Sequence, residues 1–331
     1  MTPAEDRGWL VCERTVAALG KLEQVLRSEV HADDLQLRVV AVELVQRGGK
    51  RLRPALLLLS ASIAGSDWPA GEAPLLNAAA ALEMVHVASL YHDDVMDRAP
   101  LRRSGMSVNA RWGNAVASLG GTYLFAKASG LFARLGDHAN RLAGEAFVEL
   151  CGGQLREVEN AYNLALSEQE HLEILGSKTA TLFELPCELG AYLAGLPIAA
   201  TEALARYGHY LGIAFQIADD VLDITGSPGM TGKAAGTDLR EGVYSLSVLH
   251  ALRSDGAAAA RIRELLARVH LEDGEIEEVV GLLRESGAVS HALATARTSV
   301  ARALDALASV PAGDARTSLE RLAFHAMARS S

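Results

Sequence analysis

The chain has 331 residues, of which 50% are apolar, 22% are charged and 5% are aromatic. This apolar fraction argues against intrinsic disorder and excludes a collagen-like or low-complexity protein. A formal net charge of −10 argues against a general nucleic-acid binder. Three cysteines, Cys12, Cys151 and Cys187, lie far apart and fit neither a zinc motif nor a disulfide framework. They are typical of a reducing compartment.

The sequence carries no expected membrane or export signal. The longest uncharged run near the N-terminus, residues 54–66, has 13 residues and is too short to cross a bilayer. The first residues lack both the basic flank and the apolar core of a signal peptide. We therefore expect a cytoplasmic protein without a transmembrane segment.

Helix formers dominate the chain, and alternating patterns rich in Val, Ile and Thr are hard to find. The periodicity predicts major helices over residues 9–30, 37–46, 54–64, 75–95, 113–134, 141–161 and 201–224. The helices at 75–95 and 201–224 are apolar on nearly every side, which places them inside a bundle. We expect an all-α fold, a single domain over residues 1–331 with its motifs within about 40–250, surrounding a central cavity.

Local signals refine the second half of the chain. Ser167 and Glu170 match a capping box, which predicts a helix start. Pro186 should kink or end the helix that follows, unless its surroundings tolerate it. Residues 226–236 contain four glycines and one proline and predict a mobile loop.

Two aspartate-rich motifs end the two apolar helices: Asp93-Asp94-Val-Met-Asp97 and Asp219-Asp220-Val-Leu-Asp223. Residues four apart lie on one helix face, so the first and last aspartate of each motif point together. Clustered carboxylates at a helix C-terminus repel one another and the helix dipole, and therefore need a cation. Oxygen-rich sites of this kind suit Mg²⁺ shared with a phosphate. One such motif is often a solvated acidic turn; two copies favour a metal site.

Basic residues supply what a diphosphate needs besides metal. The turn Gly48-Gly-Lys-Arg-Leu-Arg-Pro54 carries three bases beside two glycines, which let the backbone approach an anion. Arg102 and Arg103 follow the first acidic motif, and Lys178 and Lys233 lie further along the chain. The pattern predicts a cavity for two diphosphates, one bridged by metal and one held by Arg and Lys.

In these stretches the sequence resembles the trans-type (E-) polyprenyl diphosphate synthases. The matching segments are residues 48–54, 83–103, 178–180, 215–223 and 236–242. The resemblance implies an isoprenoid-synthase helical bundle, a homodimer, and a Mg²⁺-dependent prenyltransferase with about three bound ions. Its substrates would be isopentenyl diphosphate and an allylic diphosphate, and its product an all-trans polyprenyl diphosphate.

The resemblance also assigns roles to residues. Those that would hold isopentenyl diphosphate are Lys50, Arg53, His86 and Arg103. Those that would bind metal are Asp93, Asp97 and Asp219, with Asp94 and Asp223 in support. Those that would complete the allylic site are Arg102, Lys178, Thr179, Gln216 and Lys233. Asp93, Asp97, Asp219 and Lys178 would be catalytic because they stabilise the leaving diphosphate.

Product length should depend on bulk before the first motif. Ala88 and Ser89, just over one helical turn before Asp93, are small. In short-chain members of the family an aromatic residue commonly blocks this place, so we expect a medium- to long-chain product, longer than C15. Tyr123, Phe125 and Phe132 are alternative residues that could close the tunnel.

Two other functions remain open at this point. A class I terpene cyclase would share an acidic metal motif, but usually lacks the second aspartate motif and the glycine–arginine turn. A non-catalytic partner subunit of a heteromeric synthase would tend to lack the aspartates, all six of which are present here.

Overall fold

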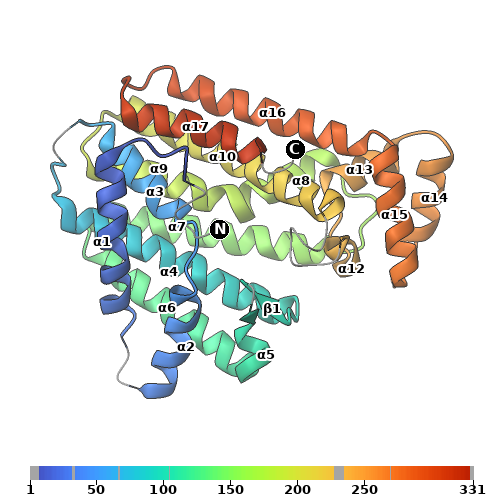
Figure 1. The fold of residues 1–331 in the computed structure, drawn as a ribbon, viewed down its shortest axis with the longest axis horizontal. Helices are drawn as coiled ribbons and strands as arrows, with labels where there is room; N and C mark the ends of the chain where they lie inside the picture. The colour runs from blue at the N-terminus through green and yellow to red at the C-terminus, as the bar shows by residue number, and fades with distance from the viewer. Residues whose placement is uncertain are drawn as a thin grey trace. The chain divides into compact units, whose positions relative to one another are not determined.

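The computed structural model describes residues 7–31, 34–65, 68–103, 105–226, 235–268 and 270–328 (Figure 1). Helices dominate this part of the chain, and a short antiparallel hairpin pairs β1 (Leu101–Arg102) with β2 (Gly105–Met106). The all-α expectation is confirmed. The hairpin was not predicted, because two-residue strands leave no alternation in the sequence.

The longer helices agree with the predicted ranges within a few residues. In the first half of the chain they are α1 (Glu13–Glu29), α2 (Leu35–Gln46), α3 (Leu52–Ser62), α4 (Glu72–Met96), α5 (Val108–Trp112), α6 (Asn114–Ala133) and α7 (Asp137–Glu159). The second half contains α8 (Glu168–Leu175), the π-turn η1 (Gly176–Ala180), α9 (Thr181–Leu193), α10 (Ile198–Thr225), α12 (Thr237–Glu241), α13 (Leu246–Arg253), α14 (Ala257–Leu266), α15 (Asp273–Glu285), α16 (Ala288–Leu307) and α17 (Asp314–Ala328).

Contacts divide the chain into two compact units. The first comprises Met1–Ala146, Leu182–Gly208 and Leu307–Leu322, and the second comprises Phe147–Thr181, His209–Ala306 and Ala323–Ser331. Each unit therefore draws on segments far apart in sequence. The single domain over residues 1–331 stays a prediction.

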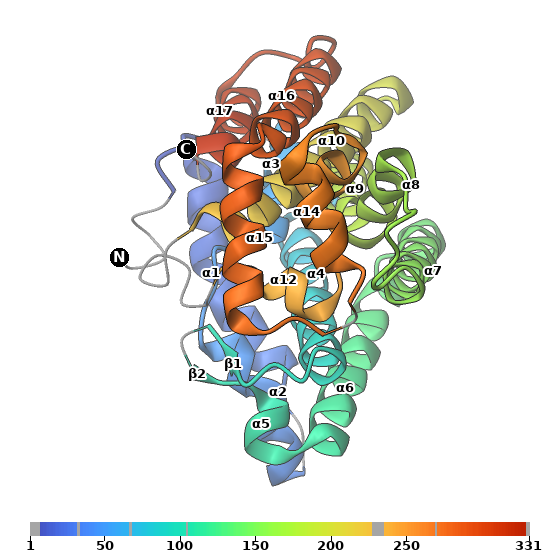
Figure 2. The same cartoon turned by 90° about the vertical axis from the view of Figure 1, so that its right-hand side faces the viewer.

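In the first unit α4 is the central helix. It packs against α1, α3 and α6, as Figures 1 and 2 both show. Residues Leu56 to Leu59 of α3 are fully buried, as the apolar run predicts. By length and composition α4 could cross a membrane, which the sequence analysis excludes, but 67% of its most apolar window is buried. Burial of that kind is what a core helix shows.

Glycines let the helices of the first unit approach one another closely. A Cβ at Gly190 of α9 would lie 2.2 Å from the carbonyl oxygen of Leu57 in α3. A Cβ at Gly208 of α10 would lie 2.4 Å from the carbonyl oxygen of Phe183. Both distances are shorter than van der Waals contact, so these positions require glycine for packing rather than for backbone freedom.

In the second half of the chain, the capping signal predicted from the sequence marks a helix start, whereas the proline does not mark a helix end. Ser167 and Glu170 form the predicted capping box at the start of α8. The following segment does not stop at Pro186: η1 interrupts the helix first, and α9 then continues through the proline to Leu193. Most of the predicted loop at 226–236 lies outside the described residues.

Replacing Gly190 with alanine should destabilise the protein by about 1–3 kcal/mol, since the added methyl group overpacks the contact with α3. Urea unfolding of the purified variant measures this change. Gly20→Ala is the matched control, because a Cβ at that exposed helical position meets nothing within 4 Å. Equal stability of the two variants would contradict the packing argument.

Candidate functional site

Arg51 fixes the glycine–arginine turn that precedes α3. Its guanidinium Nη1 lies 2.6 Å from Glu83 Oε1 and its Nε lies 2.7 Å from Glu23 Oε1. Nη2 also donates to the carbonyl of Val45 at 2.8 Å, and Arg51 is only 3% exposed. The basic turn predicts Arg51 as one of three bases for an anion, but in the structure Arg51 pairs with two carboxylates. Loss of Glu83 would leave a buried charge, which typically costs about 3–5 kcal/mol.

Arg103, next to the β1–β2 hairpin, lies over the same turn. Its Nη1 donates to the carbonyl of Gly48, and a Cβ at Gly49 would lie 3.2 Å from its Nη2. Because Gly49 has no side chain, the Arg103 guanidinium can lie close to the backbone of the turn. Lys50 sits on the turn with an exposed side chain.

His86, in α4, lies among these cations. Desolvation lowers the pKa of His86 well below its ordinary value, and the positive charges of Arg53 and Arg103 lower it further. Arg102 and Arg51 act in the same direction. A neutral imidazole surrounded by guanidinium groups marks a region of strong positive potential, which an anion would complete. The structure thus brings together three of the four residues predicted for one diphosphate, and Lys50 lies on the adjoining turn.

The three aspartates of the first acidic motif differ in burial. Asp94 is fully buried and accepts from Arg102 Nε at 2.7 Å, while Asn109 donates to its main-chain carbonyl at 2.8 Å. Asp93 and Asp97 lie one turn apart on the outer side, and the Asp97 N–H donates to the Asp93 carbonyl at 2.8 Å. Asp93 is partly exposed and Asp97 is exposed, whereas the buried Asp94 orients Arg102. The ion pair between Asp94 and Arg102 was not predicted from the sequence.

The residues predicted to set product length are small and close to His86. Ala88 is fully buried, and the Ser89 hydroxyl donates to the His86 carbonyl at 2.9 Å. Of the alternative bulky residues, Phe125 stacks on His92 with 5.8 Å between ring centroids, and the Tyr123 hydroxyl donates to the His31 carbonyl at 2.6 Å.

The second acidic motif, in the second unit, forms a polar network with η1. The Thr179 hydroxyl donates to Gln216 Oε1 at 2.9 Å, and Gln216 Nε2 donates to Asp220 Oδ1 at 2.8 Å. Burial raises the pKa of Asp220 to about 7, Asp219 adds to the rise, and Gln216 and Lys178 oppose it. Asp220 was not among the predicted site residues, although it stands inside the motif.

Asp223 holds the start of α12. Its carboxylate accepts from the backbone N–H groups of Thr237 and Asp238, each at 3.2 Å. Burial, followed by the charges of Asp223 and Asp220, raises the pKa of Asp238 well above its ordinary value. Asp238 belongs to the segment 236–242 that resembles the family. Its proximity to Asp223 and Asp220 could not be predicted from the sequence, because it depends on the tertiary fold.

Lys178 projects from η1 and pairs with Glu157 of α7. A Cβ at Gly153 would lie 2.5 Å from the backbone nitrogen of Lys178, so this glycine lets α7 approach the π-turn closely. Lys233, predicted for the same diphosphate, lies outside the described residues.

Carboxylates outweigh cations in this part of the second unit. Asp219 and Glu157 act on Asp220, and Asp223, Asp220 and Glu157 act on Asp238, while Lys178 opposes the effect at Asp220. Hard oxygen donors under mutual repulsion are the donor set that a divalent cation such as Mg²⁺ prefers. The residues present therefore fit such an ion, which would relieve the repulsion.

Comparison with known proteins agrees with the resemblance. The sequence model of the polyprenyl synthetase family matches residues 35–283. The nonaprenyl diphosphate synthase of Mycobacterium tuberculosis is 39% identical over 313 residues, 95% of this chain and 92% of that protein. Component 2 of the heptaprenyl diphosphate synthase of Geobacillus stearothermophilus is 35% identical over 93% of this chain and 94% of that protein.

A solved structure has the same fold over almost the whole chain. The polyprenyl synthase of Caulobacter crescentus, complexed with calcium and isoprenyl diphosphate, superimposes with a TM-score of 0.90 at 35% identity. The match covers 96% of this chain and 98% of that one.

His86 should remain neutral at pH values where an ordinary histidine is protonated. Below the unfolded pKa of about 6.5, the unfolded chain gains a proton that the folded chain does not, so stability falls as pH falls toward the lowered pKa. His86→Gln should therefore lose less unfolding free energy than the wild type between pH 7 and pH 5. A ring resonance of His86 that titrates at or above the ordinary value in NMR spectra would contradict this.

Proposed function

The chain belongs to the polyprenyl synthetase family and is a polyprenyl diphosphate synthase, and from this we propose that it condenses isopentenyl diphosphate with an allylic diphosphate into an all-trans product longer than C15. The observation that carries the proposal is that His86 lies within the electrostatic influence of Arg53, Arg103, Arg102 and Arg51, and that Arg103 lies over the glycine–arginine turn. These arginines supply the charge that a diphosphate requires.

Isopentenyl diphosphate is proposed to bind at Lys50, Arg53, His86 and Arg103. Arginine suits this role because its planar guanidinium donates two parallel hydrogen bonds to phosphate oxygens. The buried Arg51–Glu83 pair holds the turn that carries Lys50. Because the site is cationic without any metal, binding here should not require one.

The allylic diphosphate needs a different arrangement. Asp93, Asp97 and Asp219 are the proposed Mg²⁺ ligands, about three ions in all, while Asp94 and Asp223 support the site through Arg102 and α12. The residues proposed to contact the allylic diphosphate itself are Arg102, Lys178, Thr179, Gln216 and Lys233. When bound, Mg²⁺ supplies positive charge that stabilises the leaving diphosphate.

The proposed roles of the protein groups follow from where charge develops. Arg102 and Lys178 donate to diphosphate oxygens as the allylic C–O bond breaks, which stabilises the departing anion electrostatically. The double bond of isopentenyl diphosphate then forms the new C–C bond, and a proton leaves, with the departing diphosphate as its acceptor. Gln216, held by Thr179, orients the polar end of the substrate.

The decisive experiment incubates the purified chain with labelled isopentenyl diphosphate, Mg²⁺ and each allylic primer in turn. We expect label in a polyprenyl product, and none after chelation of the metal. Asp219→Asn should lower turnover by roughly 100-fold or more, as expected when transition-state charge stabilisation is lost. Asp305→Asn, at an exposed position of α16, is the matched control.

If the isolated chain incorporated no labelled isopentenyl diphosphate into product, the proposal would be wrong and one of the alternatives would be favoured. A cyclase would consume the allylic diphosphate alone. A partner subunit would turn over only with a second protein, and one relative is indeed named as component 2 of a synthase.

Ser89→Phe should shorten the product, because a ring at this position of α4 adds bulk just over a turn before Asp93. Ser89→Ala, which adds none, should leave the length unchanged. Chromatography of the products compares the three proteins. A wild-type enzyme that makes only C15, or a Ser89→Phe variant with products of undiminished length, would contradict the assignment.

We also propose that the enzyme is a homodimer in the cytoplasm. On α7 of the second unit, Val148, Leu155 and Val158 are 75%, 58% and 54% exposed. With the exposed Cys151 they repeat every three or four residues and form one apolar stripe along the helix. A stripe of this kind fits the packing of a second copy across a two-fold axis.

Leu155→Glu should therefore shift the chain from dimer to monomer in sedimentation experiments, since it places a charge on that stripe. Val16→Asp, at another exposed apolar position on α1, should leave the dimer intact. A wild-type monomer, or a dimer that survives Leu155→Glu unchanged, would refute this interface.

A further inference from the structure

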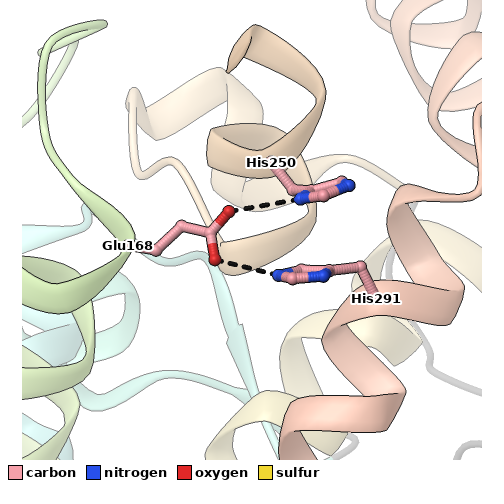
Figure 3. Close-up of side chains that lie close together, drawn as sticks. All are labelled: Glu168, His250 and His291. Carbon is pink, nitrogen blue, oxygen red and sulfur yellow. Dashed lines mark hydrogen bonds and ion pairs between the residues drawn. The ribbon is translucent and has the colours of Figure 1, made fainter. Parts of the chain in front are cut away.

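Three side chains from separate helices of the second unit meet in one cluster (Figure 3). Glu168 comes from the first turn of α8, His250 from α13 and His291 from the first turn of α16. Glu168 Oε1 lies 3.2 Å from His250 Nδ1, and Oε2 lies 2.9 Å from His291 Nε2. One carboxylate thus bridges two imidazoles.

The ionisation of the three groups suits a cation. Burial acts to raise the pKa of Glu168, but the hydrogen bonds and charges of His291 and His250 outweigh it and lower the pKa. An ionised carboxylate only accepts hydrogen bonds, so both histidines donate to it, and neutral rings suffice for this. In the other tautomer of each ring, His250 Nδ1 and His291 Nε2 carry lone pairs instead of protons. These two nitrogens and a carboxylate oxygen of Glu168 could then all bind one cation.

The three helices are held in register by the surrounding structure. Leu166, Leu249 and Ala288, neighbours of the three residues along the chain, pack in one buried apolar cluster. Arg253, one turn after His250, donates to the carbonyl of Leu166, which ties α13 to the segment before α8. Glu168 is not needed to cap its helix, because Ser167 and Glu170 form the capping box.

We propose that Glu168, His250 and His291 form a binding site for a divalent transition-metal ion, Zn²⁺ being the best fit. The ligand atoms lie within 4.8 Å of one another. Zn²⁺ bonds of about 2.0–2.1 Å place neighbouring ligands of a tetrahedron about 3.3 Å apart, a spacing within that limit. Water would complete the coordination, since the side chains are 29–35% exposed.

Binding requires one local rearrangement. The two rings stack with 3.7 Å between centroids and 13° between planes, so an ion cannot lie in both ring planes at once. One imidazole must turn, which its partial exposure permits. The site would be chemically distinct from the aspartate motifs: imidazole selects Zn²⁺, Cu²⁺ or Ni²⁺, whereas oxygen-only sites select Mg²⁺. Such an ion would cross-link α8, α13 and α16.

The test uses the full, metal-free chain in excess Mg²⁺, which occupies oxygen sites, with Co²⁺ as a visible probe of nitrogen ligation. We expect one Co²⁺ per chain with the strong absorption bands of a four- or five-coordinate ion, displaced by Zn²⁺. His250→Gln and His291→Gln should weaken binding by more than about tenfold. His270→Gln, at an exposed histidine of the same unit, is the control and should bind like the wild type.

Failure here leaves the prenyltransferase proposal untouched, because Mg²⁺-dependent turnover should be the same in wild type and His291→Gln. Absence of the bands in the wild type would overturn the metal site. Equal bands in wild type and both histidine variants would also overturn it, since the probe would then lie elsewhere. If a histidine variant fails to fold by circular dichroism, Glu168→Gln provides the same comparison.

Discussion

The structure depends on a concentration of like charge in each unit. In the first unit, burial and then the charges of neighbouring arginines lower the pKa of the His86 imidazole. In the second unit, burial and then the charges of neighbouring carboxylates raise the pKa values of Asp220 and Asp238. Like charges held together in partly buried places cost free energy, and ligands of opposite charge relieve that cost. The arginine cluster thus suits a diphosphate, and the carboxylate cluster suits a divalent cation such as Mg²⁺.

Ion pairs and hydrogen bonds to neighbouring groups hold the charged residues of each cluster in place. Glu83 and Glu23 fix Arg51, so the turn presents Lys50 and leaves room for Arg103. Asp94 orients Arg102, and Asp223 caps α12. Asp94 in the first motif and Asp220 and Asp223 in the second motif therefore have polar partners within the protein.

The sequence predicts the helices well because a 3.6-residue period and capping signals are local. Ser167 and Glu170 show this most clearly. It also predicts which residues carry charge chemistry, since the aspartate motifs and the basic turn each lie within a few residues. Pairings between distant segments were not predictable: Arg51 with Glu83, Gly190 against Leu57, and Glu168 with two histidines depend on the tertiary fold. The π-turn that positions Lys178 likewise leaves no periodic signal.

Calorimetric titration of isopentenyl diphosphate into the metal-free chain tests the central claim most directly. If the arginines around His86 form a complete diphosphate site, binding occurs in the presence of chelator, weakens as salt rises, and is accompanied by proton uptake as the anion restores the basicity of His86. Binding that appears only after Mg²⁺ is added, or that is the same in an Arg103→Gln variant, would contradict the claim.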